Sequence, residues 1–139
     1  MLRTRRTQLL LIGLAVILPA SWAWCPPQAA QPQPKVISLR SQGEGYLRLL
    51  GGPPETSTMR SGLVTLAPGK SVGRHNTEKY EEVLIILEGS AAVSVSAGGS
   101  IQVPEGYGFY CPPHTEHDVK NIGGGLLRYV YIVAEAKTR

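Results

Sequence analysis

The sequence lacks any sustained helical pattern. No stretch of ten or more residues keeps its apolar side chains at the spacing of one helix face, which argues against a helical bundle. Glycine and proline are frequent instead, with 16 Gly and 11 Pro among 139 residues, and they interrupt short apolar runs. No repeat of fixed period occurs, and the length accommodates one domain with a short additional segment.

The chain also has little excess charge outside its first segment. It carries 14 Lys and Arg against 10 Asp and Glu, but Arg3, Arg5 and Arg6 lie within the first 24 positions. The remainder therefore has 11 basic against 10 acidic side chains. Nothing in this balance indicates a basic surface, so we expect no nucleic-acid partner.

A long apolar run is missing as well. The apolar stretch from Leu9 to Leu18 is shorter than the roughly 20 residues that a membrane-spanning helix needs. Because it follows a basic start and precedes the small residues Ser21 and Ala23, residues 1–24 have the layout of an export signal. We predict cleavage and a periplasmic or extracellular protein, which contacts the membrane only through this segment if it is retained. The arginine pair also suits twin-arginine export, so the route stays open.

Cysteine is scarce, with Cys25 and Cys111 only. The two would meet an oxidising compartment after export, but sequence alone does not bring them within bonding distance. Lipid modification of Cys25 is the alternative for that position. Residues 25–34, CPPQAAQPQP, form a predicted Pro/Gln-rich linker, and the ordered domain is expected over residues 35–139.

Short apolar runs that end at Gly or Pro turns make up the rest of the chain. Many short strands with such punctuation predict an all-β sandwich or barrel, with one or two further edge strands within residues 35–50. The expected strands are Leu63–Ala67, Val83–Leu87, Ala92–Ser96, Ile101–Val103, Tyr107–Cys111 and Leu127–Val133.

The three histidines fall in two short segments. His75 precedes Thr77 and Glu82, and the pair His114 and His117 lies in the segment PPHTEHDVKN. A strand would point His75 and Thr77 to the same face, whereas Glu82 joins that face only if a turn or bulge intervenes near residues 78–80.

The spacing of these residues resembles two sequence motifs of small single-domain cupins. The first reads Gly69-x5-His75-x-Thr77-x4-Glu82-x6-Gly89, and the second reads Gly106-x5-Pro112-x-His114-x2-His117-x3-Asn121. The resemblance covers about residues 60–133. It implies a single jelly-roll β-barrel, and a homodimer is expected on the same ground.

Metal-bearing cupins bind one divalent ion inside the barrel, so the resemblance implies His75, Glu82 and His117 as ligands of Mn, Fe, Zn or Ni. Thr77 replaces the second histidine of the motif, and a hydroxyl is a poorer ligand than imidazole for such metals. His114 replaces a glycine and is a candidate fourth ligand.

Other motif residues are expected to serve structure or to line a pocket. We predict that Gly69, Gly89 and Gly106 serve backbone geometry and that Asn121 braces a turn. The predicted pocket residues are Thr77, Tyr107, Phe109, Tyr129 and Tyr131.

Two classes of function compete at this stage. The first is an exported cupin whose metal holds or transforms a small oxygen-rich molecule, such as a carboxylate, a carbonyl compound or a sugar, by oxygenase, isomerase or decarboxylase chemistry. The second is a metal-free binding module for a sugar or small acid. A metal-independent sugar epimerase is a further alternative. It would need a His base and a Tyr acid across the pocket, and His75 or His117 facing Tyr107 could supply them.

Overall fold

The computed structural model describes residues 31–40, 43–96 and 98–137. The predicted export signal, Cys25 and most of the predicted linker lie outside these residues. The described part contains nine β-strands. It contains no helix that is long and apolar enough to cross a membrane. The strands are β1 Gly45–Gly51, β2 Arg60–Leu66, β3 His75–Asn76, β4 Tyr80–Glu88, β5 Ser90–Val95, β6 Gly99–Pro104, β7 Gly108–Cys111, β8 Glu116–Asn121 and β9 Leu127–Glu135.

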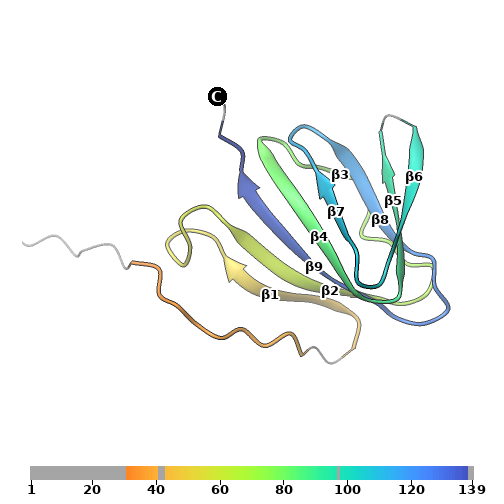
Figure 1. Ribbon diagram of the computed structural model, residues 1–139, viewed down its shortest axis with the longest axis horizontal. Helices are drawn as coiled ribbons and strands as arrows, with labels where there is room; N and C mark the ends of the chain where they lie inside the picture. The colour runs from red at the N-terminus through yellow and green to blue at the C-terminus, as the bar shows by residue number, and fades with distance from the viewer. Residues whose placement is uncertain (1–30, 41–42, 97, 138–139) are drawn as a thin grey trace, which may run out of the picture.

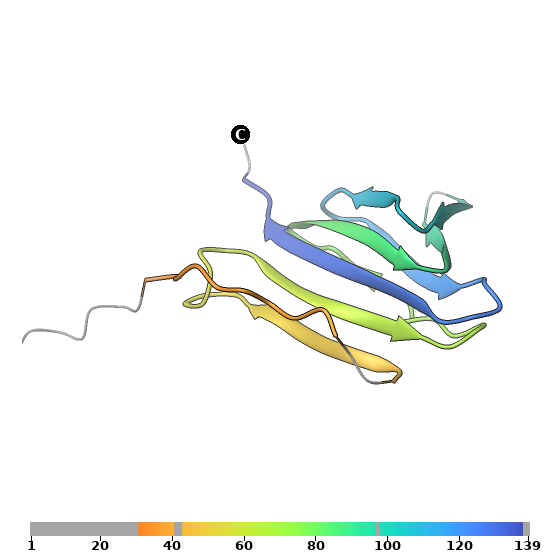
Figure 2. The same ribbon diagram turned by 60° about the horizontal axis from the view of Figure 1, so that its bottom comes forward.

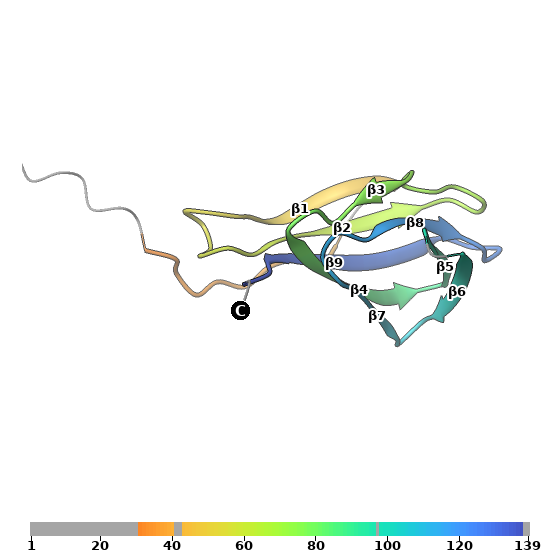
Figure 3. The ribbon, with the colours of Figure 1, turned by 90° about the horizontal axis from the view of Figure 1, so that it is seen from above.

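The strands form two antiparallel sheets that enclose the core (Figure 1). One has five strands in the order β1-β2-β9-β4-β7, and the other has four in the order β3-β8-β5-β6. This two-sheet jelly roll confirms the predicted all-β fold. The described N-terminal segment and the C-terminal end of β9 lie at the same end of the molecule (Figure 3). Residues 31–40, orange in Figure 2, form no strand, and Leu39 accepts a hydrogen bond from Arg128 on β9.

Buried and exposed side chains alternate along the strands, so one face of each sheet points into the barrel and the other points to solvent. On β4 the side chains of Glu82, Leu84 and Ile86 are buried, whereas Val83 and Ile85 are exposed. Successive side chains of a strand point to opposite faces, so the buried residues share the inner face. The same period places His117, Val119 and Asn121 inward on β8.

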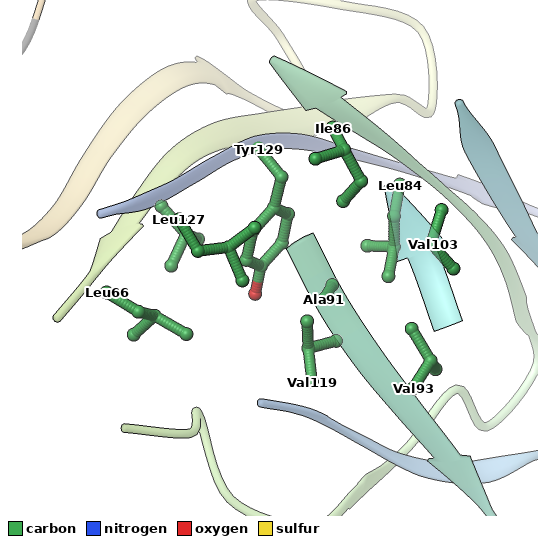
Figure 4. Close-up of a cluster of buried hydrophobic side chains, with 10 residues drawn as sticks. Leu66, Leu84, Ile86, Ala91, Val93, Val103, Val119, Leu127 and Tyr129 are labelled. Carbon is green, nitrogen blue, oxygen red and sulfur yellow. The ribbon is translucent and has the colours of Figure 1, made fainter. Parts of the chain in front are cut away.

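The apolar core occupies one part of the barrel interior (Figure 4). Side chains from both sheets point toward one another there, and Tyr129 lies among them. Truncating a buried leucine of this kind typically costs about 2–5 kcal/mol. The cluster consists of Val64, Leu66, Leu84, Ile86, Ala91, Val93, Val103, Val119, Leu127 and Tyr129. The inward rows of β4 and β8 continue beyond it to Glu82 and His117, so the polar residues lie next to the core inside the barrel.

Two motif residues stabilise the connections around this core. The amide nitrogen of Asn121 donates to the carbonyls of Leu66 (2.9 Å) and Gly125 (2.8 Å), and its side-chain oxygen accepts from Gly123 N–H (2.9 Å). Its predicted bracing role is thereby confirmed. Gly89 has φ of 85°, and a Cβ there would meet the Leu126 carbonyl oxygen at 2.6 Å, so only glycine fits.

Candidate metal centre

The site is built from both sheets because the chain turns sharply between His75 and Glu82. Glu78 has φ of 55°, and Tyr80 N–H donates to the Thr77 carbonyl at 2.9 Å, which closes the turn expected near residues 78–80. As a result β3 joins the four-stranded sheet and β4 the five-stranded sheet. His75 is paired directly with His117 across β3 and β8, while Glu82 approaches from the opposite sheet.

The donor atoms of these three residues converge. Glu82 Oε2 lies 3.2 Å from His117 Nε2 and 4.0 Å from His75 Nε2, and the two imidazole centroids are 4.2 Å apart. One donor atom from each residue lies within 4.8 Å of the other two. Two donors bonded to one ion at about 2.1 Å would be roughly 3.0–3.4 Å apart, so a small inward movement of His75 completes the spacing.

Hydrogen bonds at the far side of each imidazole ring fix its orientation. His75 Nδ1 lies 2.9 Å from the Gly73 carbonyl oxygen, and His117 Nδ1 lies 3.5 Å from the Thr115 carbonyl oxygen. A proton on Nδ1 donated to these carbonyls leaves Nε2 with its lone pair, which is the arrangement that supports metal ligation.

The Nε2 atom of His117 is buried and unusual. It forms no hydrogen bond with any described residue, although Glu82 Oε2 lies 3.2 Å away, so its ring direction does not aim at that oxygen. Buried polar atoms without a partner are rare, and each calls for an explanation. An ion placed between Nε2 and the carboxylate would satisfy both, so these residues fit a divalent metal.

Electrostatics around His117 are dominated by burial and by Glu82. Burial lowers the pKa of His117, but the Glu82 carboxylate, with smaller contributions from the Thr115 carbonyl and Asp118, more than offsets this, and the pKa lies above its usual value. The nearby Cys111 thiol, 3.4 Å from His117 Nδ1, is fully buried, and burial first and then the Glu82 charge raise its pKa to about 11. Cys111 is thus a neutral neighbour of the site.

Thr77 joins the two motif segments through its hydroxyl. The hydroxyl donates to the Pro112 carbonyl at 2.8 Å and accepts from Thr115 N–H at 2.9 Å, and the side chain is buried. Both bonds point toward the turn that precedes β8. At the position where the motif has a histidine, this chain therefore has a structural link between β3 and that turn.

His114 lies apart from the three converging residues. It is exposed, it is not in the described group of donors, and its N–H donates to the Glu78 carbonyl at 2.7 Å. Its φ of 57° is in the left-handed region, which explains why the motif has a glycine here. The geometry does not bring His114 into the site as a fourth ligand.

A cavity of about 320 Å³ opens beside the site, and His75 and Glu82 form part of its wall. The predicted Thr77, Tyr129 and Tyr131 line it, whereas Phe109 packs against the core and Tyr107 is 64% exposed elsewhere. The pairing of His75 or His117 with Tyr107 that was considered for an epimerase is therefore not formed. Sequence reasoning missed four polar wall residues, and nothing in their local sequence singles them out: Tyr46, Arg60, Arg74 and Asn76.

A two-sheet antiparallel barrel in which an exposed His75 converges with the buried Glu82 and His117 defines a small jelly-roll barrel protein. The family model described as "Cupin domain" matches residues 62–133, which is more than half of the chain, and the protein belongs to this family. No curated protein sequence matches the chain.

Solved structures agree on the fold. An RmlC-like cupin family protein from Methanocaldococcus jannaschii has a TM-score of 0.62 at 18% identity, over 73% of this chain and 91% of its own. A Cupin 2 conserved barrel domain protein from Salinispora arenicola has a TM-score of 0.58 at 23% identity, over 78% and 92%. The Cnp3 cupin domain of Schizosaccharomyces pombe has a TM-score of 0.59 at 22% identity over 66% of this chain, which spans only 64% of that domain. At these identities the likeness concerns the fold alone.

Proposed function

We propose that this cupin holds one divalent metal ion through His75, Glu82 and His117 and binds or transforms a small oxygen-rich molecule in the adjoining cavity. The observation that carries the proposal is the buried Nε2 of His117, which has no hydrogen bond with any described residue and lies 3.2 Å from Glu82 Oε2. Two imidazoles and one carboxylate suit Mn, Fe, Zn or Ni and leave coordination positions for a ligand.

The residues around the ion have separable roles in this proposal. When bound, the ion supplies a Lewis acid for a carboxylate, enediol or carbonyl oxygen. Glu82 compensates part of its charge, and the Gly73 and Thr115 carbonyls hold the two imidazole rings in the ligating tautomer. Tyr129 and Tyr131 form part of the wall of the cavity in which the ligand would lie.

We also propose export of the protein to the periplasm or beyond the cell. The support is the sequence of residues 1–24, with its basic start, short apolar run and small residues. Fractionation of the native host with an antibody to the barrel, together with N-terminal sequencing of the mature protein, tests this separately from metal binding.

Metal analysis of purified, tag-free protein tests the proposed centre. Wild-type protein should contain close to one equivalent of one divalent metal, and both His75→Ala and His117→Ala should lose it. His114→Gly is the matched control, because it removes the third histidine of the chain at an exposed position with a φ that glycine accepts. It should retain the metal.

The outcomes separate the metal centre from its alternatives. Metal at background level in wild-type protein purified from its native compartment would overturn the proposal. That result would favour the second candidate, a metal-free binding module, which is supported by the hydroxyl of Thr77 being engaged by Pro112 and Thr115. Loss of metal in His114→Gly alone would show that the wrong histidine had been assigned.

A further inference from the structure

Arg60 extends the candidate site toward the rim of the cavity. It begins β2 and lines the cavity together with Glu82. In the strand register Arg60 pairs with Val133 on β9, and Val133 pairs with Glu82 on β4. Directly paired residues of neighbouring strands point to the same face, so all three share the inner face, with Arg60 and Glu82 roughly 10 Å apart at Cα.

The guanidinium of Arg60 has no carboxylate partner among the described residues. Its Cζ lies 4.4 Å from the centroid of the Tyr80 ring, a contact that orients the group and consumes no N–H donor. Arg60 also borders a second, smaller hollow that Tyr80 and Glu135 line, and Glu135 is paired there with Lys79 at 2.7 Å. Arg60 thus lines the cavity without a described carboxylate at ion-pair distance, and its N–H donors remain available to a ligand.

Arg74 shows the contrast. It also lines the cavity, but its Nη1 lies 3.1 Å from Glu116 Oε2, so its charge is balanced within the protein. The wall thus presents one balanced and one unbalanced guanidinium. A planar guanidinium with free donors binds carboxylates in a bidentate manner, which a lysine ammonium cannot do.

The charges around the cavity favour a ligand with a carboxylate group at each end. A divalent ion with Glu82 as its one charged ligand retains positive charge at the base, and Arg60 places a second positive charge near the rim. Between these two centres the register places Val133, an apolar side chain suited to methylene groups. The volume of about 320 Å³ is at the small end of ligand pockets and suits a molecule of a few carbon atoms.

We infer that the ligand of this protein is a short dicarboxylate, with one carboxylate at the metal and the other bound by Arg60. The inference rests on the proposed metal centre and adds the class of ligand to it. Arg60 is the residue that selects a dianion over a monoanion, because a ligand with one carboxylate can satisfy only the metal.

Isothermal titration of metal-loaded protein tests the inference. The probes are malonate, succinate, glutarate and adipate, each compared with the straight-chain monocarboxylate of equal carbon number. One dicarboxylate length should bind at least tenfold more tightly than its monocarboxylate. Arg60→Gln should weaken that dicarboxylate by about 10- to 100-fold, as expected for a charge-assisted hydrogen-bond pair, and leave the monocarboxylate unchanged. Arg60→Lys should recover only part of the loss.

Arg40→Gln is the charge-matched control, since Arg40 is exposed and lies outside the cavity lining. It should bind the dicarboxylate as wild type does. Metal content and thermal unfolding are measured on every sample. A stoichiometric metal with no preference for dicarboxylates, or a preference that survives in Arg60→Gln, overturns the Arg60 inference and leaves the metal centre standing. Absence of metal in wild-type protein overturns both.

Discussion

Replacing Thr77 by valine tests how much the hydrogen bonds of its hydroxyl, which connect the two motif segments, contribute to stability. Valine has nearly the same shape, so the change removes the hydroxyl and little volume. It deletes the bond to the Pro112 carbonyl at 2.8 Å and the bond from Thr115 N–H at 2.9 Å, and it leaves the amide of Thr115 without its side-chain acceptor. The backbone bond from Thr77 N–H to the Thr115 carbonyl at 3.0 Å remains.

The expected loss in the free energy of unfolding follows from these two hydrogen bonds. Each net hydrogen bond contributes about 0.5–1.5 kcal/mol, and an unsatisfied buried partner adds to the loss. We expect Thr77→Val to lower the free energy of unfolding of the metal-free protein by about 2 kcal/mol. For a domain of roughly 100 residues this corresponds to a fall in Tm of roughly 8–16 °C.

Urea unfolding and calorimetry of the metal-free protein measure this loss. Thr77→Ser is the control, because it keeps both bonds and removes one methyl group, at a cost of about 1 kcal/mol. The reasoning is refuted if Thr77→Val unfolds within 0.5 kcal/mol of wild type, or if the serine variant loses more stability than the valine variant. Metal affinity should also fall by about 10- to 100-fold in Thr77→Val, because the Pro112–Thr115 turn positions His117.

Two further predictions concern residues near the same turn. His114→Gly should raise the free energy of unfolding by up to about 1 kcal/mol, because a non-glycine residue in the left-handed region is strained; a loss of stability in urea titrations would contradict this. Cys111 should resist Ellman's reagent in the folded protein at pH 8 and react fully in guanidinium chloride, because burial raises the pKa of its thiol to about 11. Peptide mass mapping identifies the labelled cysteine, and rapid labelling of Cys111 in the native state would refute its burial.

The fold could be predicted from the sequence because apolar runs of period two end at Gly and Pro turns. Six expected strands correspond to β2, β4, β5, β6, β7 and β9, and the segment before residue 50 supplied β1. The strand β8 was not predicted, because two of its three inward residues are His117 and Asn121, which local pattern reasoning treats as polar loop residues. The sequence signal that could have indicated β8 is the spacing of two between the inward residues His117, Val119 and Asn121.

The candidate site was predictable only where motif spacing carried it. His75, Glu82 and His117 follow from the spacing, and the structure brings them together. Arg60 and Tyr46 lie outside the two motifs and reach the cavity only through the register of β1, β2 and β9. Strand register depends on the packing of the whole sheet, so single-sequence patterns do not give it. Tyr107 is an aromatic residue at the start of an expected strand, which predicts a place in the core or the pocket wall, but β7 begins only at Gly108 and Tyr107 is exposed.

The two departures from the cupin motif are related in space. Thr77 bonds to the turn that contains His114, and the N–H of His114 bonds to the carbonyl of Glu78, the residue after Thr77. Both substitutions therefore lie where the β3–β4 turn meets the β7–β8 turn, beside the candidate metal centre. Because each turn leads directly to a proposed ligand strand, these bonds fix the relative positions of β3, β4 and β8. The chain thus has a hydrogen-bonded connection at the position where the motif has a second histidine. We expect the spacing of His75, Glu82 and His117 to depend on this connection.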